Sequence, residues 1–407
     1  MPAECAAPEG RLARKRVKDL HGDPLNRLEH GRYQENTGET MMIIDAHAHL
    51  VTPMSLFAIR SLIEVSGGHN TRAYLRGFVT DEEIRKHADQ NIALMDAVGT
   101  DMQLLSPRPF TLMHSHNRFD DIDIWVGIQN DVIHRVTELY PDRFRGVCGL
   151  PQVAGQPIEV TFAEIDRCVD ELGFVGVLLN PDPDEGRNVH PSPRLGDRYW
   201  YPLWEKLVEK NLPAHIHSAA CYGRENYDEH FASEESLAIS SVLASDVFKD
   251  FPTLRLMISH GGGSIPYQVG RWRAHWYRNQ SQSDPTVAAY LKAAEAASKA
   301  GEVAPPRPAH MVRFDDVLKK FFFDTVIHDK NALEHLFKTV GCGCTLFGTE
   351  RPGSGSTFDP DLGRQLDDLK QTIESIESLT AADRQAIFED NARRVFPRID
   401  KPVAGAN

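Results

Sequence analysis

The stretch Ile43-Ile44-Asp45-Ala46-His47-Ala48-His49 runs from apolar residues into two histidines separated by a single residue. In a β-strand, the side chains of residues i and i+2 point to the same side, so His47 and His49 would present two imidazoles to one point. A strand can offer a metal ion two ligands in this way. An isolated His-x-His pair is more often exposed or hydrogen-bonded, so the other histidines of the chain decide between the two interpretations.

Histidines and carboxylates also close apolar runs elsewhere in the chain. His215-Ile216-His217 and His260 each end such a run, and Asp324 and Glu350 end two more. Imidazoles and a carboxylate gathered from several strand ends are typical of a mononuclear catalytic site of the zinc type, with room for a bound water. At this point either histidine of the 215–217 pair and either carboxylate could be the ligand.

Short apolar runs alternate with amphipathic segments along most of the chain, which predicts repeated βα units. Eight such units favour an α/β fold of the (β/α)8 TIM-barrel type. Catalytic residues of these barrels lie at the carboxyl ends of the strands, which is where the histidines and Glu350 fall. The predicted strands are 42–47, 102–106, 145–150, 174–179, 212–218, 254–260, 320–325 and 344–348.

Two segments depart from a minimal barrel. Residues 1–41 are rich in polar residues and poor in large apolar ones, which predicts a polar N-terminal extension without a core of its own. Residues 276–318 follow the sixth strand and predict a helical insertion, which either covers the site or forms a solvated surface helix. We therefore expect one barrel domain over residues 42–399, followed by a short tail at 400–407.

Composition excludes several classes of function. The formal net charge of −13 over 407 residues, without basic patches, argues against nucleic acid or an anionic membrane as partner. An anionic substrate stays possible, because a few arginines in a pocket outweigh a remote acidic surface. No apolar run is long enough to span a bilayer and no signal peptide is evident, so we expect a soluble cytoplasmic protein.

The cysteines support an intracellular enzyme with reduced thiols, because their spacing forms no disulfide framework. Cys342-x-Cys344 has the form of a metal-binding pair, but it precedes a strand-like run and is interpreted as structural. The six cysteines are Cys5, Cys148, Cys168, Cys221, Cys342 and Cys344.

Taken together, these motifs resemble one known family, the amidohydrolase-2 group of the amidohydrolase superfamily, over residues 42 to 399. The group includes metal-dependent decarboxylases and 4-oxalomesaconate hydratases. The decarboxylases usually carry an aspartate after strand eight, whereas Glu350 in this chain is similar to the hydratases. The motifs that carry the resemblance are His47-x-His49, His217, Ser259-His260-Gly261-Gly262-Gly263, Gly348-Thr349-Glu350 and Asn391-Ala392-Arg393-Arg394-Val395-Phe396.

The resemblance implies a site built around one metal ion. It favours His217 over His215 as the third imidazole ligand, after His47 and His49, and makes Glu350 the fourth ligand or the base beside a bound water. Zn²⁺ is the expected metal, with Mn²⁺ as the alternative. His260 or Glu350 would move protons.

Other polar residues take secondary roles in this interpretation. Asp324 would orient a ligand, since Glu350 already fills the carboxylate position. The glycines at 261–263 would let the chain turn tightly beside the metal. His114, His116 and His328 are interpreted as loop histidines, although His116 could reach substrate.

A polyanionic substrate needs fixed cations, and guanidinium groups bind carboxylates with two hydrogen bonds. Arg108 and Arg271 are the candidates, because both follow strand ends in loops expected to face the pocket. Tyr267 and Asn180 are weaker candidates at its rim. The hydratases carry an arginine six residues after the glutamate; this chain has Ser356 there, and Arg351 is considered as a partial replacement.

Three activities follow from the resemblance. The first is a Zn-dependent hydratase acting on an unsaturated keto-polycarboxylate such as 4-oxalomesaconate, in aromatic-acid degradation. The second is a non-oxidative decarboxylase of a hydroxybenzoate or muconate-type acid. A metallohydrolase ranks last, because the bridging lysine expected after strand four is missing from 175–180. The resemblance also implies a homodimer or a higher homo-oligomer.

Overall fold

Eight parallel strands form one sheet in the chain order β1 to β8. The computed structural model describes residues 41–51, 53–66, 72–116, 118–403 and 405. The predicted (β/α)8 barrel is confirmed, and each of the eight predicted strands is present. The strands are β1 (Ile44–His49), β2 (Met102–Ser106), β3 (Phe144–Gly149), β4 (Gly176–Leu179), β5 (Pro213–Ile216), β6 (Arg255–Ile258), β7 (Phe322–Asp324) and β8 (Thr345–Leu346).

Hydrogen bonds between the first strand and the segment after the last close the barrel. The backbone N–H of Ala46 donates to the Phe347 carbonyl at 2.8 Å, and the N–H of His49 donates to the Arg351 carbonyl at 3.0 Å. Ala48 and Arg351 also form an isolated parallel bridge. Because of this closure, Glu350 lies beside the two histidines of β1.

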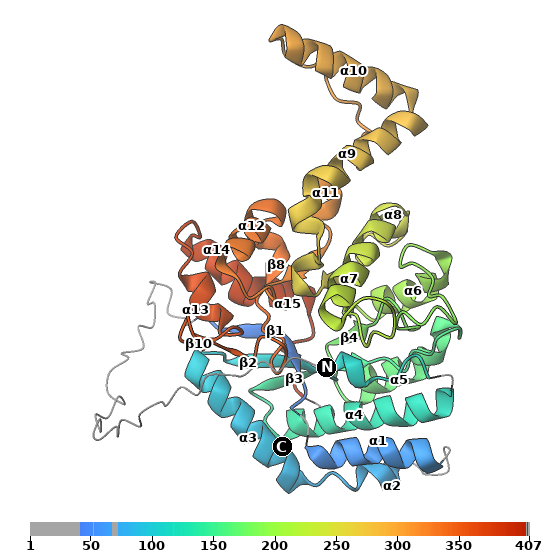
Figure 1. Ribbon diagram of the computed structural model, residues 1–407, viewed down its shortest axis with the longest axis vertical. Helices are drawn as coiled ribbons and strands as arrows, with labels where there is room; N and C mark the ends of the chain where they lie inside the picture. The colour runs from blue at the N-terminus through green and yellow to red at the C-terminus, as the bar shows by residue number, and fades with distance from the viewer. Residues whose placement is uncertain (1–40, 52, 67–71, 117, 404, 406–407) are drawn as a thin grey trace, which may run out of the picture. The chain divides into compact units, whose positions relative to one another are not determined.

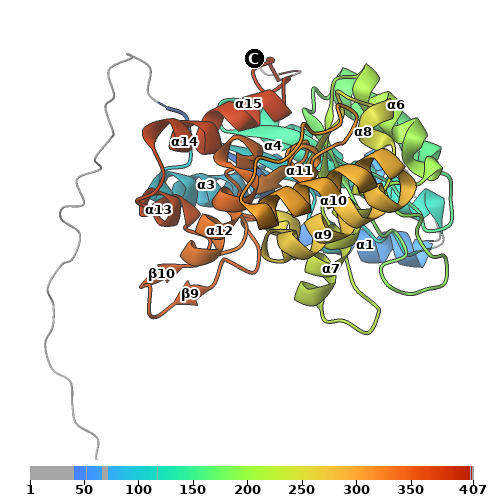
Figure 2. The ribbon, with the colours of Figure 1, turned by 90° about the horizontal axis from the view of Figure 1, so that it is seen from above.

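Helices surround the strands in Figure 1, and Figure 2 shows the same elements from above. A small two-stranded sheet, β9 (Phe358–Asp359) and β10 (Arg364–Gln365), follows the barrel closure. The helices are α1 (Met54–Ser66), α2 (Arg72–Arg76), α3 (Asp81–Val98), α4 (Phe119–Leu139), α5 (Phe162–Asp166), α6 (Tyr201–Glu209), α7 (Tyr227–Leu243), α8 (Val247–Asp250), α9 (Ile265–Ser283), α10 (Pro285–Ala300), α11 (Phe314–Leu318), α12 (Lys330–Val340), α13 (Leu369–Glu374), α14 (Ala381–Gln385) and α15 (Asn391–Val395).

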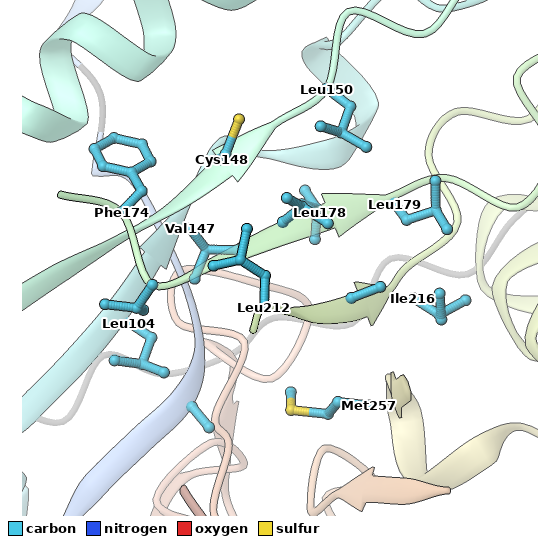
Figure 3. Close-up of a cluster of buried hydrophobic side chains, with 14 of the residues drawn as sticks. Leu104, Val147, Cys148, Leu150, Phe174, Leu178, Leu179, Leu212, Ile216 and Met257 are labelled. Atoms are coloured by element: carbon cyan, nitrogen blue, oxygen red, sulfur yellow. The ribbon is translucent and has the colours of Figure 1, made fainter. Parts of the chain in front are cut away.

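The barrel strands are buried on both faces, as parallel strands covered by helices must be. Figure 3 shows one cluster in which successive strands contribute apolar side chains that are at most 1% exposed. Burial of such side chains is the main favourable contribution to folding. These residues are Leu104 of β2, Val147 of β3, Leu178 of β4, Ile216 of β5 and Met257 of β6.

Only β2 has the predicted boundaries, and the other strands differ from the prediction by one or two residues at one or both ends; two of these differences have a clear local reason. Strand β1 begins at Ile44 instead of residue 42, because the N–H groups of Met42 and Ile43 donate to the side chains of Glu389 and Asp101. Strand β4 begins at Gly176 instead of 174, because the Phe174 N–H donates to the Cys168 carbonyl at the end of the preceding helical segment. These N–H groups are used by side chains or by the preceding helical segment, so the two strands begin later than predicted.

The predicted insertion after β6 is helical. It comprises the C-terminal part of α9 together with α10 and α11, and Figure 1 shows α9 and α10 extending away from the strands. Helix α10 buries only Val287 among its sixteen residues. The alternative of an exposed surface helix therefore describes α10.

The predicted N-terminal extension, residues 1–41, lies almost wholly outside the described residues, so its character stays a prediction. Among the described residues, no helix is both long enough and apolar enough to cross a membrane. Five cysteines of the described part have free thiols, and Cys342 and Cys344 belong to no group of three or more metal-binding side chains there.

Candidate metal centre and active site

The two histidines of β1 point to the same side of the strand, as their spacing requires. His47 Nδ1 lies 2.6 Å from Asp324 Oδ2, and His49 Nδ1 lies 2.9 Å from Ser106 Oγ. With Nδ1 of each ring occupied, Nε2 is left, and the two Nε2 atoms are 3.3 Å apart. Carboxylate or hydroxyl contacts on the far nitrogen are how proteins orient metal-binding histidines.

His217 and Glu350 face the same point from the other side of the barrel. His217 Nδ1 donates to the Ser218 carbonyl at 2.5 Å, and its Nε2 lies 3.7 Å from Glu350 Oε1. Both His217 Nε2 and Glu350 Oε2 are buried without a hydrogen-bond partner. Two unpaired buried polar atoms that face one region indicate a missing ligand, because burial without a partner is costly.

These four residues could hold a divalent metal ion. One ligand atom from each of His47, His49, His217 and Glu350 lies within 4.8 Å of the other three. Three imidazole nitrogens and a carboxylate oxygen form a donor set that suits a borderline divalent cation. The donor chemistry and the two unpaired atoms therefore fit a divalent metal ion.

Backbone contacts fix Glu350 at this position. Its N–H donates to the His47 carbonyl at 2.6 Å, and its φ angle is +59°, in the left-handed region. Gly348 precedes it in close contact with β1, since a Cβ there would lie 2.9 Å from His47 Cβ. The chain can turn Glu350 into the site only because residue 348 has no side chain.

Asp324 and His215 are neighbours of the four ligand candidates, and both contact His47. Asp324 accepts hydrogen bonds from the N–H groups of Gly261 and Val326, in addition to its contact with His47. His215 Nε2 pairs with Ser259 Oγ at 2.8 Å. His47, His215 and Asp324 also form a group within 4.8 Å, but its members already have protein partners. This geometry matches the orienting role expected of Asp324.

His260 connects the four residues to a carboxylate that the sequence analysis missed. Its Nε2 lies 3.2 Å from Glu350 Oε1, and its Nδ1 lies 2.7 Å from Glu235 Oε1. Glu235 is fully buried. Burial opposes the charged form of His260, but the two carboxylates outweigh it and raise the pKa of His260 well above its usual range.

The opposite shift applies to the histidines of β1 and β5. Burial, and then the neighbouring histidines, lower the pKa of His47, His49 and His215 well below the usual range. Burial also opposes the charge of Glu350, but His260 and His217 outweigh it and lower the pKa of Glu350. These shifts favour neutral His47 and His49 beside an ionised Glu350, the protonation states that metal binding requires.

Helix α7 carries the groups that surround His260. Tyr227, Phe231 and Glu235 recur every four residues and so share one helix face. The Phe231 ring stacks on His260 with centroids 5.4 Å apart. The turn at Gly263 lets α7 approach, since a Cβ on Gly263 would lie 2.3 Å from the Ala232 carbonyl oxygen.

A cavity of about 420 Å³ leads to the four residues. Arg108 is its lining cation, and its Nη2 donates to the Pro352 carbonyl at 3.0 Å. The predicted position of Arg108 near the pocket agrees with this lining. The lining residues are His49, Arg108, Pro109, Phe110, Tyr227, Asp228, Glu350, Pro352, Gly353 and Ser354.

A family model described as amidohydrolase matches residues 44–398. The chain belongs to the amidohydrolase family. The resemblance inferred from the histidine motifs is thus confirmed, and the match spans the whole barrel.

Two hydratases are similar to this amidohydrolase over nearly their full length. The 2-keto-4-carboxy-3-hexenedioate hydratase of Sphingobium sp. is 34% identical over 365 residues, which cover 88% of this chain and 97% of the relative. The crystal structure of 4-oxalomesaconate hydratase from Rhodopseudomonas palustris matches with a TM-score of 0.70 and 32% identity, again over 88% and 97%. A 2-amino-3-carboxymuconate-6-semialdehyde decarboxylase of Dictyostelium discoideum is 26% identical over 75% of each chain.

Arg271 of this amidohydrolase is not in a loop, contrary to the prediction, and Tyr267 does not line the pocket at whose rim it was expected. Both lie on helix α9, because the helix begins at Ile265, soon after β6. Arg271 lines a different cavity of about 640 Å³, together with Gln268, Trp272 and others of the same helix. Tyr267 is 82% exposed. Neither lines the cavity that contains Glu350.

Asn180 is buried rather than at a rim. Its Nδ2 lies 3.1 Å from His114 Nδ1, and its Oδ1 accepts from the Asp182 N–H. His114 in turn pairs with the Leu150 carbonyl at 2.9 Å. Asn180 therefore ties loops together through its side chain, as a buried amide must find partners.

Arg351 does not take over the role of the hydratase arginine. Its Nε donates to Asp367 at 3.0 Å and its Nη2 to Asp368 at 3.0 Å. Ser356, which stands where the hydratases have arginine, donates through Oγ to the same Asp367. The buried Arg351 guanidinium is already paired with two carboxylates, and these contacts argue against the partial replacement.

Proposed function

We propose that this amidohydrolase is a metal-dependent lyase that adds water to a C=C bond of an unsaturated keto-polycarboxylate such as 4-oxalomesaconate. The observation that carries the proposal is the pair of side-chain contacts that His260 makes with Glu235 and Glu350. Through Glu350, these contacts connect a proton-transfer pair directly to the candidate metal ligands. Similarity to two hydratases over 97% of their lengths supports the same activity.

We propose that His47, His49, His217 and Glu350 hold Zn²⁺, with Mn²⁺ as the alternative. When bound, the ion supplies Lewis acidity, which makes water a better nucleophile and polarises substrate oxygens. The orienting contacts of Asp324 and Ser106 keep Nε2 of the β1 histidines available for it.

His260 and Glu350 are the groups that move protons. Hydration places OH on one carbon of the double bond and H on the other, so one proton leaves water and one reaches carbon. Glu350 Oε1 faces His260 at 3.2 Å, which allows a proton to pass between them. Glu235 holds the imidazole through Nδ1 and stabilises its charged form.

Arg108 is the residue that would bind a substrate carboxylate, since it is the cation that lines the cavity beside Glu350. A guanidinium can form two charge-assisted hydrogen bonds with a carboxylate. Tyr227, which lines the same cavity, would contribute a further hydrogen bond.

A decarboxylase of a hydroxybenzoate or muconate-type acid is the second candidate. The observation that favours it is Ser356, because the position that resembles the substrate-binding arginine of the hydratases carries no cation and Arg351 is bound elsewhere. Similarity to a carboxymuconate semialdehyde decarboxylase supports this candidate at lower identity.

Absorbance and CO2 release distinguish the two. The metal-loaded protein is incubated with 4-oxalomesaconate and, separately, with a panel of hydroxybenzoates. Loss of ultraviolet absorbance without CO2 is expected for the hydratase, because hydration removes the conjugated double bond. CO2 release would assign a decarboxylase, and no change with any substrate at full metal content would contradict both.

A further inference from the structure

A second cluster of metal-binding side chains lies outside the centre described above. Asp182 comes from the loop after β4, Cys221 and Glu225 from the segment before α7, and His230 and Glu234 from α7 itself. Ligand atoms of Asp182, His230 and Glu234 lie within 4.8 Å of one another, and so do those of Cys221, Glu225 and His230. His230 belongs to both groups.

His230 is the residue that indicates a ligand. It is only 2% exposed, and its Nε2 is buried without a hydrogen-bond partner. Its Nδ1 lies 3.3 Å from Glu225 Oε2. A carboxylate on one ring nitrogen and an unpaired second nitrogen is the arrangement of a metal-binding histidine oriented by its neighbour.

The cluster also carries negative charge without a cation to balance it. Among the described residues, no lysine or arginine pairs with Asp182, Glu225 or Glu234 within salt-bridge distance. Burial, and then the carboxylates of Asp182, Glu225 and Glu235, raise the pKa of Glu234 to about 7. A divalent cation would remove this repulsion.

Asp182 is held in place and still has capacity for a ligand. Its Oδ1 accepts from Ser192 Oγ at 2.6 Å and from the Asp184 N–H at 3.2 Å, and its Oδ2 accepts from the Gly186 N–H at 2.7 Å. Each carboxylate oxygen offers two lone pairs, so Oδ2 keeps one for a cation. Glu234 stands one helical turn after His230 and therefore on the same face of α7.

We propose that Asp182, His230 Nε2 and Glu234 bind a second divalent cation of the Zn²⁺ class, with Glu225 orienting the imidazole. Donors around a tetrahedral Zn²⁺ with bonds of about 2.1 Å lie about 3.4 Å apart, so donors within 4.8 Å need only a small closure. Water completes the coordination. This site has one imidazole and two carboxylates, whereas the centre at the strand ends has three imidazoles and one carboxylate.

The second ion would fasten helix α7 to the loop after β4. The same helix carries Phe231, which stacks on His260, and Glu235, which pairs with it. The ion therefore acts as a positioning element for His260 and touches no reacting atom. The inference does not depend on which reaction the centre catalyses.

Metal content tests the proposal. Wild-type protein, His230→Gln and Glu234→Gln are stripped with a chelator, saturated with Zn²⁺, dialysed and analysed for zinc per chain. His310→Gln is the matched control, since His310 pairs with Asp284 far out on the insertion with an exposed side chain. We expect about two Zn²⁺ in the wild type and the control, and about one in each cluster variant.

Three further variants distinguish this site from the four-residue centre and test which side chains are its donors. His217→Asn should also lose one Zn²⁺ but retain the ion at α7, and adding His230→Gln to it should remove the remaining ion. Cys221→Ser should keep both ions. One Zn²⁺ in the wild type, or equal zinc content in wild type and both cluster variants, would overturn the proposal; loss in Cys221→Ser would overturn the donor set.

Thermal unfolding gives a readout independent of activity. Adding Zn²⁺ to the stripped His217→Asn variant should raise its Tm, since an ion that binds only the folded state stabilises it. The same addition to His217→Asn with Glu234→Gln should leave Tm unchanged. An equal rise in both would contradict the site, and Glu234→Gln preserves the test if His230→Gln fails to fold.

Discussion

The active site has two halves of different origin. The strand half consists of His47, His49, His217 and Glu350, at the ends of β1, β5 and β8. The helix half comes from α7, whose Phe231 and Glu235 surround His260. In the proposed function, the strand half holds the donors for the metal, and the helix half controls His260, the group that moves protons.

The difference shows how a barrel can place its metal ligands on one set of elements and adjust the charge and orientation of a catalytic group with another. Hydrogen bonds between neighbouring strands fix the strand ends. Ligand atoms there therefore keep their spacing when the loops change. A helix packed over the rim can shift against the strands, and its contacts with His260 decide that residue's charge and orientation. Substitutions in the two halves should therefore have different signatures.

The largest effect is expected from His217→Asn. Removing one imidazole should release one metal ion per chain and lower kcat/KM by about 10⁴-fold, since the metal contributes several kcal/mol to the transition state. Metal analysis and steady-state kinetics measure the two effects. His215→Asn is the matched control on the same strand, because His215 pairs with Ser259. Equal metal loss in both variants would contradict the assignment of His217.

Glu350→Gln should have the next largest effect. The amide keeps the shape of the side chain but cannot accept a proton from His260, so we expect kcat to fall about 10²- to 10³-fold at saturating metal. Kinetics at a series of zinc concentrations separate loss of metal from loss of proton transfer. Full turnover with full metal content would remove Glu350 from both roles.

The strand half could be predicted from the sequence and the helix half could not. His47 and His49 are two residues apart, so the geometry follows from the strand itself, and each strand end is marked by the change from apolar to polar residues. The fold follows from eight such changes. Glu235 sits inside a helix whose polar residues include several glutamates, and only the packing of α7 selects one of them.

The errors in the substrate contacts have a related cause. Arg271 was expected in a loop because it follows a strand end, and Tyr267 at the rim of the pocket, but helix α9 begins at Ile265 and carries both. Arg351 was considered as a partial replacement for the arginine of the hydratases, but its side chain pairs with Asp367 and Asp368, which follow the small sheet of β9 and β10. Partners contributed by distant segments are not encoded in local spacing. The spacing of Tyr227, Phe231 and Glu235, which are four residues apart, could have indicated from the sequence that one face of α7 lies at the active site.

Glu235→Gln tests the helix half directly. The amide can still accept a hydrogen bond from His260 but no longer stabilises its charged form, so kcat should fall about 10- to 100-fold, as for other orienting partners. KM and metal content should stay unchanged, because Glu235 does not reach the four ligand candidates. Glu334→Gln, a partly buried carboxylate on α12 paired with Lys338, is the control. Loss of metal in Glu235→Gln would mean that the two halves are not separable.

The smallest effect is expected from Phe231→Leu, which removes the ring that stacks on His260 while keeping an apolar side chain. Aromatic stacking contributes about 0.5–1.5 kcal/mol beyond burial, so kcat should fall by about 2- to 12-fold. Phe248→Leu is the matched control, because Phe248 is also buried and packs against Phe321 with centroids 4.8 Å apart. Both variants should lose similar stability in a thermal melt, but only Phe231→Leu should lower kcat. If the two lower kcat equally, the loss comes from stability alone, and α7 acts on His260 through Glu235 without help from the ring.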